Sequence, residues 1–217
     1  MIILRQLWID DTQIDDLLPI NGLQRLNTLS ISKTNVTNLE PIKDLVNLKF
    51  LYLSHTNIEN INPLTNMRKL EFLDLSKTRV SDLSGIKGLY GLRTLELSFT
   101  NVSSLNSINT LINLTSLDIK NSGVDDLNGI QKLENLEYLF CSNTNIESLD
   151  PLTNLPNLSL IDLGNTKVTE ITPLKSLPNL RQVFIEESQS TLLGSLEKIA
   201  THEYFVQIKR PNPPSQP

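Results

Sequence analysis

The chain contains few side chains that could carry out chemistry. Its histidines are His55 and His202, and its one cysteine is Cys141. Four serines recur at a constant interval on both sides of His55: Ser32, Ser54, Ser76 and Ser98. Asp74 lies within the same set, so a Ser–His–Asp arrangement can be drawn on paper. No glycine-rich elbow, oxyanion hole or pocket accompanies it in the sequence, and we interpret His55 as a solvated surface residue.

The remaining reactive groups also favour structural roles. Cys141 stands where equivalent positions of the chain hold leucine or isoleucine, so we expect a small core residue rather than a nucleophile. Phosphate-binding loops, dinucleotide fingerprints and metal-ligand spacings are absent from the sequence. The sequence therefore predicts a protein that is not an enzyme and that holds no metal or cofactor.

Charge and composition narrow the choice of partner. The chain has 19 basic and 24 acidic residues and a net charge of −5, which disfavours nucleic acid and favours a partner with a basic surface. No apolar run reaches the roughly 18 to 20 residues that span a bilayer. The first residues, MIILRQLWIDD, lack the basic region of a signal peptide. We expect a cytoplasmic protein, with signal-independent secretion left open, and no contact with membranes.

A repeat of 22 residues organises the whole chain. Its leading leucines are Leu4, Leu26, Leu48, Leu70, Leu92, Leu114, Leu136, Leu158 and Leu180. If each of them is position 1, the apolar residues at positions 1, 4 and 6 alternate as in a short strand, and later apolar residues recur three apart. Only stacked neighbours can bury such a pattern, so the repeat predicts a solenoid.

Two further positions of the unit carry structural signals. Position 9 is threonine or serine from Thr12 to Ser188, and we expect its hydroxyl to turn inward and satisfy backbone groups in a polar ladder. Position 16 is often proline, and the residue before it is often of a type that caps helices. This pair predicts a capped 3-10 or very short α segment on the convex side.

The pattern resembles leucine-rich-repeat proteins of the 22-residue class, which includes bacterial internalins and a eukaryotic phosphatase-regulating subunit. The resemblance covers Leu4 to about Ser188 and implies an α/β, right-handed solenoid with about nine parallel strands on the concave face. The family usually has asparagine at position 9, so we expect fewer hydrogen bonds per step of the ladder here. A signal peptide and helical N-terminal cap like those of internalins are not seen, so their adhesin function is not carried over.

The two ends depart from the repeat. We expect the solenoid to occupy residues 1–188, a C-terminal cap of a helix (191–200) and a strand (204–209) to occupy 189–210, and a disordered proline-rich tail to occupy 211–217. At the other end the apolar residues Ile2, Ile3, Leu4 and Leu7 have no preceding unit to cover them. Self-association through this end is therefore expected.

Positions 3 and 5 of each unit should point out onto the concave face. They hold seven of the 11 aromatic residues: Trp8, Phe50, Tyr52, Phe72, Tyr138, Phe140 and Phe184. Phe99, at position 8, lies on the same rim. Strand propensity alone could favour aromatic residues there. An exposed apolar patch with aromatic anchors is, however, typical of a binding site.

The aromatic residues form two groups, Phe50, Tyr52 and Phe72 in one and Tyr138 and Phe140 in the other. An acidic column of Asp74, Glu96 and Asp118 runs between these groups, with Asp162 two units further on. Carboxylates on adjacent strands, ~4.8 Å apart, repel one another. Either the neighbouring Lys77, Arg93 and Lys120 screen them or a basic side chain of a partner lies along the column.

The sequence thus predicts a non-catalytic module that binds a protein on its concave aromatic and acidic face. Three identities compete for it. The first is a bacterial intracellular inhibitor or immunity protein. The second is a secreted effector that engages a host protein such as a phosphatase, and the third is the recognition fragment of a larger enzyme.

Overall fold

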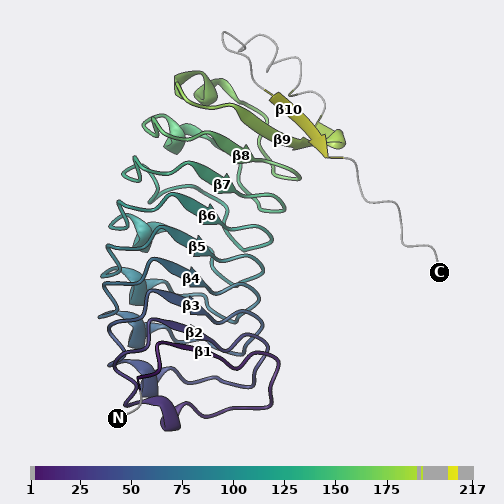
Figure 1. Cartoon of the computed structure of the whole chain (residues 1–217). Helices are drawn as coiled ribbons and strands as arrows, with labels where there is room; N and C mark the ends of the chain where they lie inside the picture. The colour runs from purple at the N-terminus through teal and green to yellow at the C-terminus, as the bar shows by residue number, and fades with distance from the viewer. Residues whose placement is uncertain (1–2, 190–191, 193–204, 210–217) are drawn as a thin grey trace, which may run out of the picture.

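The computed structural model describes residues 3–189, 192 and 205–209, and shows an elongated coil with one sheet along its side (Figure 1). Ten parallel strands form this sheet in chain order. They are β1 (Gln6–Trp8), β2 (Thr28–Ser30), β3 (Phe50–Tyr52), β4 (Phe72–Asp74), β5 (Thr94–Glu96), β6 (Ser116–Asp118), β7 (Tyr138–Phe140), β8 (Leu160–Asp162), β9 (Gln182–Glu186) and β10 (Phe205–Lys209). The predicted solenoid with one parallel sheet is confirmed.

The strand register follows the 22-residue repeat without a slip from β1 to β9. Leu7 pairs with Leu29, and Leu29 pairs with Leu51. The same step continues to the last pair, in which Ile161 lies beside Val183. Every strand therefore presents positions 3 and 5 of its unit on one face and position 4 on the other.

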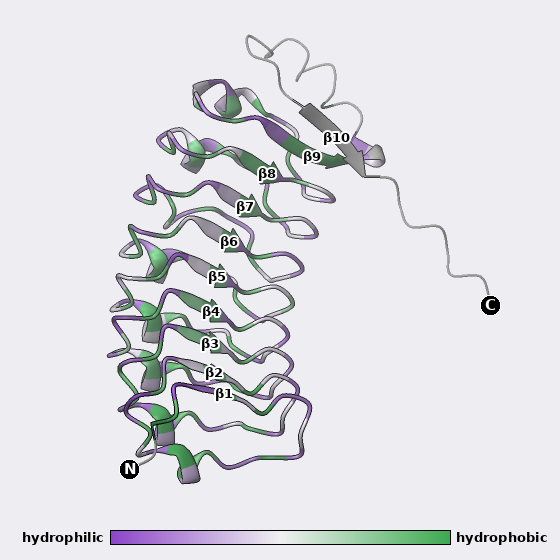
Figure 2. Ribbon diagram, viewed as in Figure 1, coloured by the Kyte–Doolittle hydropathy of each residue, from purple (hydrophilic) through white to green (hydrophobic). Residues whose placement is uncertain are grey.

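The core is a single column of aliphatic side chains behind the sheet. Leu51, Leu73, Leu95 and Leu117 are all fully buried, and the residues that follow three apart are buried in every unit after the first. Figure 2 shows the hydrophobic segments returning at the same place in successive coils. Among the described residues this core contains no aromatic side chain.

Short 3-10 segments lie on the side of the coil opposite the sheet, as predicted. They are η1 (Leu18–Ile20), η2 (Glu40–Ile42), η3 (Asn62–Leu64), η4 (Ser84–Ile86), η5 (Asn106–Ile108), η6 (Asp150–Leu152) and η7 (Thr172–Ser176), and η8 (Glu187–Gln189) follows β9. The unit that contains β6 has no such segment. There Gly129 has φ +105°, and a Cβ atom would lie 2.2 Å from the carbonyl oxygen of Leu105.

The expected capping position was wrong. In η1 to η7 the side chain that caps the 3-10 segment belongs to position 13 and lies two residues before the one we expected at position 15. The Oδ1 atom of Asn38 accepts the backbone N–H of Glu40 at 2.9 Å, and Asp82 accepts that of Ser84 at 2.8 Å. Position 15 is instead the first residue of the 3-10 segment, and only a side chain two residues earlier reaches its free N–H.

The hydroxyl at position 9 turns inward as predicted. Thr34, Thr56 and Thr78 are buried, and each donates to the carbonyl three residues earlier at 2.6 to 2.7 Å. These bonds stay within one unit. Neighbouring units are joined by asparagines at position 22: Asn113 and Asn135 each donate to a carbonyl of the preceding unit at 2.8 Å.

One element of the predicted C-terminal cap lies within the described residues. The strand expected at 204–209 is present as β10, which pairs in parallel with β9. The helix expected at 191–200 lies outside the described residues except for Leu192, a helical and buried residue. The predicted tail at 211–217 also lies outside them.

Candidate binding face

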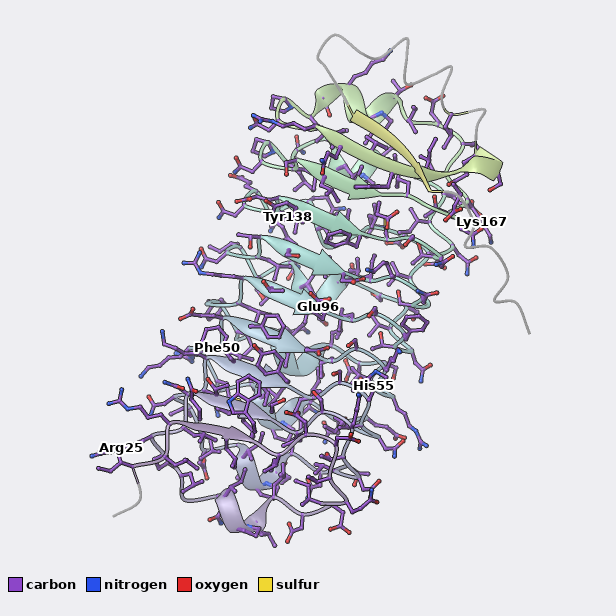
Figure 3. All side chains as sticks on the ribbon, turned by 45° about the vertical axis from the view of Figure 1, so that its right-hand side comes forward. Arg25, Phe50, His55, Glu96, Tyr138 and Lys167 are labelled. Carbon is purple, nitrogen blue, oxygen red and sulfur yellow. The ribbon has the colours of Figure 1, made fainter. Side chains whose placement is uncertain are left out.

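The concave face carries the predicted residues in two parallel rows. The strand register places position 5 in one row, which runs Trp8, Ser30, Tyr52, Asp74, Glu96, Asp118, Phe140, Asp162 and Phe184. Position 3 forms the other row and includes Phe50, Phe72 and Tyr138. Figure 3 shows Phe50, Glu96 and Tyr138 on this face, with Arg25 on one edge of the coil and His55 on the other.

Three aromatic rings form one cluster across the first four strands. The Trp8 and Tyr52 ring centroids are 5.4 Å apart, and those of Tyr52 and Phe72 are 4.8 Å apart, both pairs tilted by about 35°. Ser30, which lies between Trp8 and Tyr52 in the row, is small and buried, so the indole passes over it. The sequence predicted a group of Phe50, Tyr52 and Phe72, and the structure adds Trp8, which remains 56% exposed.

A second aromatic group lies on β7. Tyr138 is 41% exposed and borders an open hollow that Arg181 and Gln182 also line. Phe140, in the other row, is half-buried beneath the ammonium of Lys120, whose Nζ atom is 5.1 Å from the ring centroid. The two groups therefore differ in chemistry, because the first is stacked and apolar and the second is covered by a cation.

The aspartates of the acidic column have a structural role that the sequence reasoning missed. Asp74 and Asp118 each accept the backbone N–H two residues further on at 2.9 Å, and Asp162 accepts that of Gly164 at 3.1 Å. This turn closes the chain where each strand ends. The signal was available, because aspartate at the end of a strand often forms such a turn.

Glu96 is the exception in the column. It lies between Asp74 and Asp118 in the register, and its side chain is one methylene longer. Burial raises its pKa to about 7, and the charges of Asp118 and Asp74 and a hydrogen bond with Asp118 act in the same direction, against the opposing charge of Lys120. Near neutral pH this carboxyl is therefore partly protonated.

The three predicted screening cations differ in what they contact. The Lys120 ammonium is 2.9 Å from Oδ2 of Asp118 and pairs with the column directly. Lys77 instead places its Nζ atom 5.1 Å from the ring centroid of Phe99. Arg93 is exposed and makes no ion pair within the part of the chain that the structure describes.

Position 8 of every complete unit has a left-handed backbone. Eight residues share φ values of 54° to 58°: Asp11, Lys33, His55, Lys77, Phe99, Asn121, Asn143 and Asn165. They line the edge of the coil at which the strands end, here called the trailing edge. Positive φ is uncommon outside glycine, asparagine, aspartate and histidine, so the lysines and Phe99 are held there against their preference. Phe99 is consequently at the rim of the concave face, as predicted, and not on a strand.

The structure does not bring the serine, histidine and aspartate residues into a triad. The Ser76 hydroxyl donates to Asp74 at 2.5 Å, and the Ser54 hydroxyl donates to Ser32 at 3.1 Å. His55 is exposed on the trailing edge, and its ring makes no hydrogen bond with any residue in the described ranges. This arrangement leaves no nucleophile activated by His55.

Cys141 is a buried core residue, as predicted. Its thiol lies 3.0 Å from the carbonyl oxygen of Asp162, and burial raises its pKa, together with the charges of Asp162 and Asp118.

Within residues 3–189 and the other described positions, no three His, Cys, Asp or Glu side chains are grouped to hold a metal ion. The helices of the described part are all too short or too polar to cross a membrane.

Comparison with known proteins agrees with this geometry. Residues 57–210 match the family described as leucine-rich repeat region. The chain belongs to the leucine-rich-repeat family. Its relation to internalins is visible in the structure of internalin C2 from Listeria monocytogenes str. 4b F2365, with 30% identity and a TM-score of 0.77 over 87% of this chain and 84% of that chain.

Two other leucine-rich-repeat structures are similar at lower identity. The internalin InlF of the same organism has 22% identity and a TM-score of 0.56, over 95% of this chain and 76% of that chain. The ectodomain of the plant receptor kinase GASSHO1/SCHENGEN3 from Arabidopsis thaliana has 20% identity and a TM-score of 0.71, over 85% of this chain and 25% of that chain. Among curated proteins none matches. The chain is thus an internalin-like leucine-rich-repeat protein.

Proposed function

We propose that this chain is a non-catalytic protein-interaction module that binds a protein partner on its concave face. The observation that carries the proposal is the distribution of aromatic residues: seven of 11 lie in the two concave rows, whereas the described core contains none. Folding requires apolar residues in the core and not on this face. Exposed aromatic side chains at Trp8, Phe50 and Tyr138 are therefore best explained as anchors for a partner.

The charges on this face favour a partner with a basic surface. Asp74, Glu96 and Asp118 lie side by side, and one lysine, Lys120, pairs with the last of them. A cation placed against Glu96 would favour its ionised form, so binding would release a proton near neutral pH. The partner's charge thus offsets the repulsion that the free protein carries.

The separation of the aromatic groups sets the size of the partner. The cluster around Tyr52 and the group on β7 are roughly four strands apart, or ~19 Å at the usual strand spacing. A small molecule cannot contact both groups, whereas a folded surface or an extended segment can. Leucine-rich-repeat structures of this shape include the receptor kinase ectodomain solved in complex with CASPARIAN STRIP INTEGRITY FACTOR 2, an example of such a complex in another protein.

Three biological settings are compatible with the proposed binding of a protein partner. An inhibitor or immunity protein inside a bacterial cell accounts for the acidic face, and the described residues do not assemble the Ser–His–Asp arrangement of a hydrolase. An effector that engages a host protein such as a phosphatase is the alternative, and a recognition fragment of a larger enzyme is the third. The identity of the partner captured by the chain decides among these settings.

The test is affinity capture from cells followed by binding measurements with purified partner. Tyr138→Ala should raise the dissociation constant by about thirtyfold, because truncation of an aromatic hot spot costs ~2 kcal/mol. Tyr90→Ala is the matched control, since Tyr90 is a comparably exposed tyrosine that lies between strands and outside the concave rows. Equal loss of affinity in both variants, or loss only in the control, would overturn the proposal.

A further inference from the structure

The edge of the coil at which the strands begin, here called the leading edge, is the one marked by Arg25 in Figure 3. It is built from positions 21 and 22, in the turn before each strand, and from position 2 of the following unit. From the second to the fifth unit, position 21 holds Val46, Arg68, Tyr90 and Ile112. All four are exposed, and the three apolar side chains among them are 39%, 51% and 53% exposed.

These four side chains belong to adjacent, closely stacked turns of the coil. The side-chain amide of Asn113, at position 22, donates to the carbonyl of Tyr90 in the preceding unit at 2.8 Å. Gly91 also lies close to the unit before it, since a Cβ atom there would be 2.9 Å from the carbonyl oxygen of Arg68. The side chains at position 21 therefore lie side by side, at a separation close to the strand spacing of ~4.8 Å.

Basic side chains lie along the same part of the edge. Lys69 and Arg93 are exposed at positions 22 and 2, next to the row that contains Arg68. None of these three cations forms an ion pair with another described residue. Lys49 and Glu71 also lie here, but their charges cancel in an ion pair of 2.7 Å. The strip of Val46, Arg68, Lys69, Tyr90, Arg93 and Ile112 therefore has a net charge of +3.

Folding does not account for this strip. The same positions in later units hold Glu134 and Glu137, and then Pro156 and Pro178, while the sheet continues in register past them. The edge thus accepts acidic residues and proline as readily as the exposed apolar and basic residues of the strip. A contiguous apolar and charged surface that the fold does not need is typical of an interaction site.

We propose that the strip is a second interaction surface, which binds an acidic segment of a protein that also carries apolar side chains. Carboxylates of the segment pair with Arg68, Lys69 and Arg93, and the planar guanidinium groups suit such pairing best. The apolar side chains of the segment pack on the three exposed apolar residues of the strip. The inference goes beyond the proposed binding face, whose acidic column favours a partner of the opposite charge.

The charge pattern favours a protein segment over nucleic acid or membrane. A nucleic-acid backbone carries a charge at every phosphate and would pass over Glu71, which lies between Lys49 and Arg93 in the backbone ladder of this edge. An extended anionic membrane would also meet Glu134 and Glu137 on the same edge. A protein segment can instead place its carboxylates opposite the cations alone and its apolar groups between them.

A labelled synthetic peptide tests the inference without the partner of the concave face. The peptide contains glutamate, leucine and phenylalanine, and fluorescence anisotropy measures its binding to the whole chain. One control peptide has glutamine in place of glutamate, and another has serine in place of leucine and phenylalanine. Each control should bind about tenfold or more weakly, because both kinds of contact contribute. Absence of binding, or binding that does not need the glutamates, would overturn the proposal.

Charge reversal in the chain locates the contact. Arg68→Glu should weaken peptide binding by about tenfold or more, most strongly at low salt, and should keep the wild-type Tm because the side chain is exposed. Lys167→Glu is the matched control, since Lys167 is an exposed cation on the trailing edge without an ion pair among the described residues (Figure 3). Both substitutions change the net charge equally, so equal losses of affinity would contradict a contact at the strip.

Two tyrosines separate the strip from the concave face. Tyr90→Ala should weaken the peptide by about tenfold and leave the partner of the concave face unaffected. Tyr138→Ala should leave the peptide unaffected, whatever its effect on that partner. Loss of peptide binding in Tyr138→Ala, with none in Tyr90→Ala, would place the peptide on the concave face and overturn the proposal.

Single-stranded DNA and vesicles that contain phosphatidylserine represent the other two classes of ligand. We expect both to bind the chain more weakly than the peptide does, because each brings negative charge against the acidic residues around the strip. Tighter binding of either one, lost in Arg68→Glu and retained in Lys167→Glu, would assign the strip to that ligand and overturn its assignment to a protein segment.

Discussion

The two faces of each strand are under opposite constraints. Position 4 is leucine, isoleucine or valine in all nine repeat strands and is buried throughout β2 to β9, whereas positions 3 and 5 beside it include aromatic, acidic, hydroxyl and amide side chains. A solenoid must repeat its inward residues because each unit packs on copies of itself. Its outward residues need not repeat, although Asp74, Asp118 and Asp162 on the concave face also close the turns that follow their strands.

The largest effect is expected when a charged residue is placed first on the buried face of a strand and then on its concave face. Leu117→Asp buries an unpaired carboxylate in the fully buried column and should unfold several units, since damage spreads between neighbours. Ser116→Asp, one residue earlier, points to the concave face and should leave the fold in place. Thermal unfolding followed by circular dichroism separates the two, and a wild-type Tm for Leu117→Asp would contradict the assigned register.

Burial should also decide how much one kind of hydrogen bond contributes to the free energy of unfolding. Thr78 and Thr65 each donate to the carbonyl three residues earlier, at 2.6 and 2.7 Å, but Thr78 is buried and Thr65 is exposed. Thr78→Val leaves a buried carbonyl without its partner and should lower the free energy of unfolding by ~1–3 kcal/mol. Thr65→Val should lower the free energy of unfolding by only a small fraction of that amount, because water replaces the hydroxyl. Equal losses in urea titrations would show that burial is not the cause.

Periodicity predicted the larger part of this fold. The strand register, the buried column and the two concave rows all follow from residue spacing, because the spacing decides which side chains face inward. Periodicity could not predict the ring contact of Trp8 with Tyr52, because that contact depends on the small size of Ser30 between them. Spacing alone gives rows of residues, and the contacts along a row depend on side-chain size.

Local hydrogen bonds were harder to predict. The caps at Asn38 and Asp82 and the bridging amides of Asn113 and Asn135 depend on which backbone groups are left free at each turn. The sequence likewise gives no signal for the left-handed conformation at position 8 where the residue is Phe99 rather than asparagine. Capping residue types at position 13 and repeated asparagine at position 22 were signals in the sequence that pattern reading did not use.

The acidic column provides a smaller and pH-dependent contrast. The folded chain holds the Glu96 proton more tightly than the unfolded chain, with a pKa of about 7 against an ordinary value of 4.5. The stability from this proton is complete below pH 4.5 and is lost as the pH rises to about 7. Glu96→Gln cannot ionise, so its advantage over wild type should grow across that window and then stay level. Because Glu96 is partly exposed, solvent screening reduces the effect to ~1 kcal/mol.

Urea titrations at a series of pH values measure this difference. Glu147→Gln, an exposed glutamate away from the concave face, serves as the control and should follow the wild-type curve. A Glu96→Gln variant that is less stable than wild type above pH 7 would mean that Glu96 contributes as an ion, contrary to its place between two aspartates.

The smallest expected effect concerns Phe99, where stability and binding should move in opposite directions. Its φ of 56° is the one that Asn121, Asn143 and Asn165 adopt at the same position, and asparagine tolerates this conformation better than phenylalanine does. Phe99→Asn should therefore relieve ~1 kcal/mol of backbone strain. The substitution also removes the contact between Lys77 and the ring, and this loss should cancel about half of the gain in stability. A slight rise in Tm together with weaker partner binding would show that phenylalanine is kept at this rim for recognition. A fall in both would assign Phe99 a structural role and remove it from the proposed binding face.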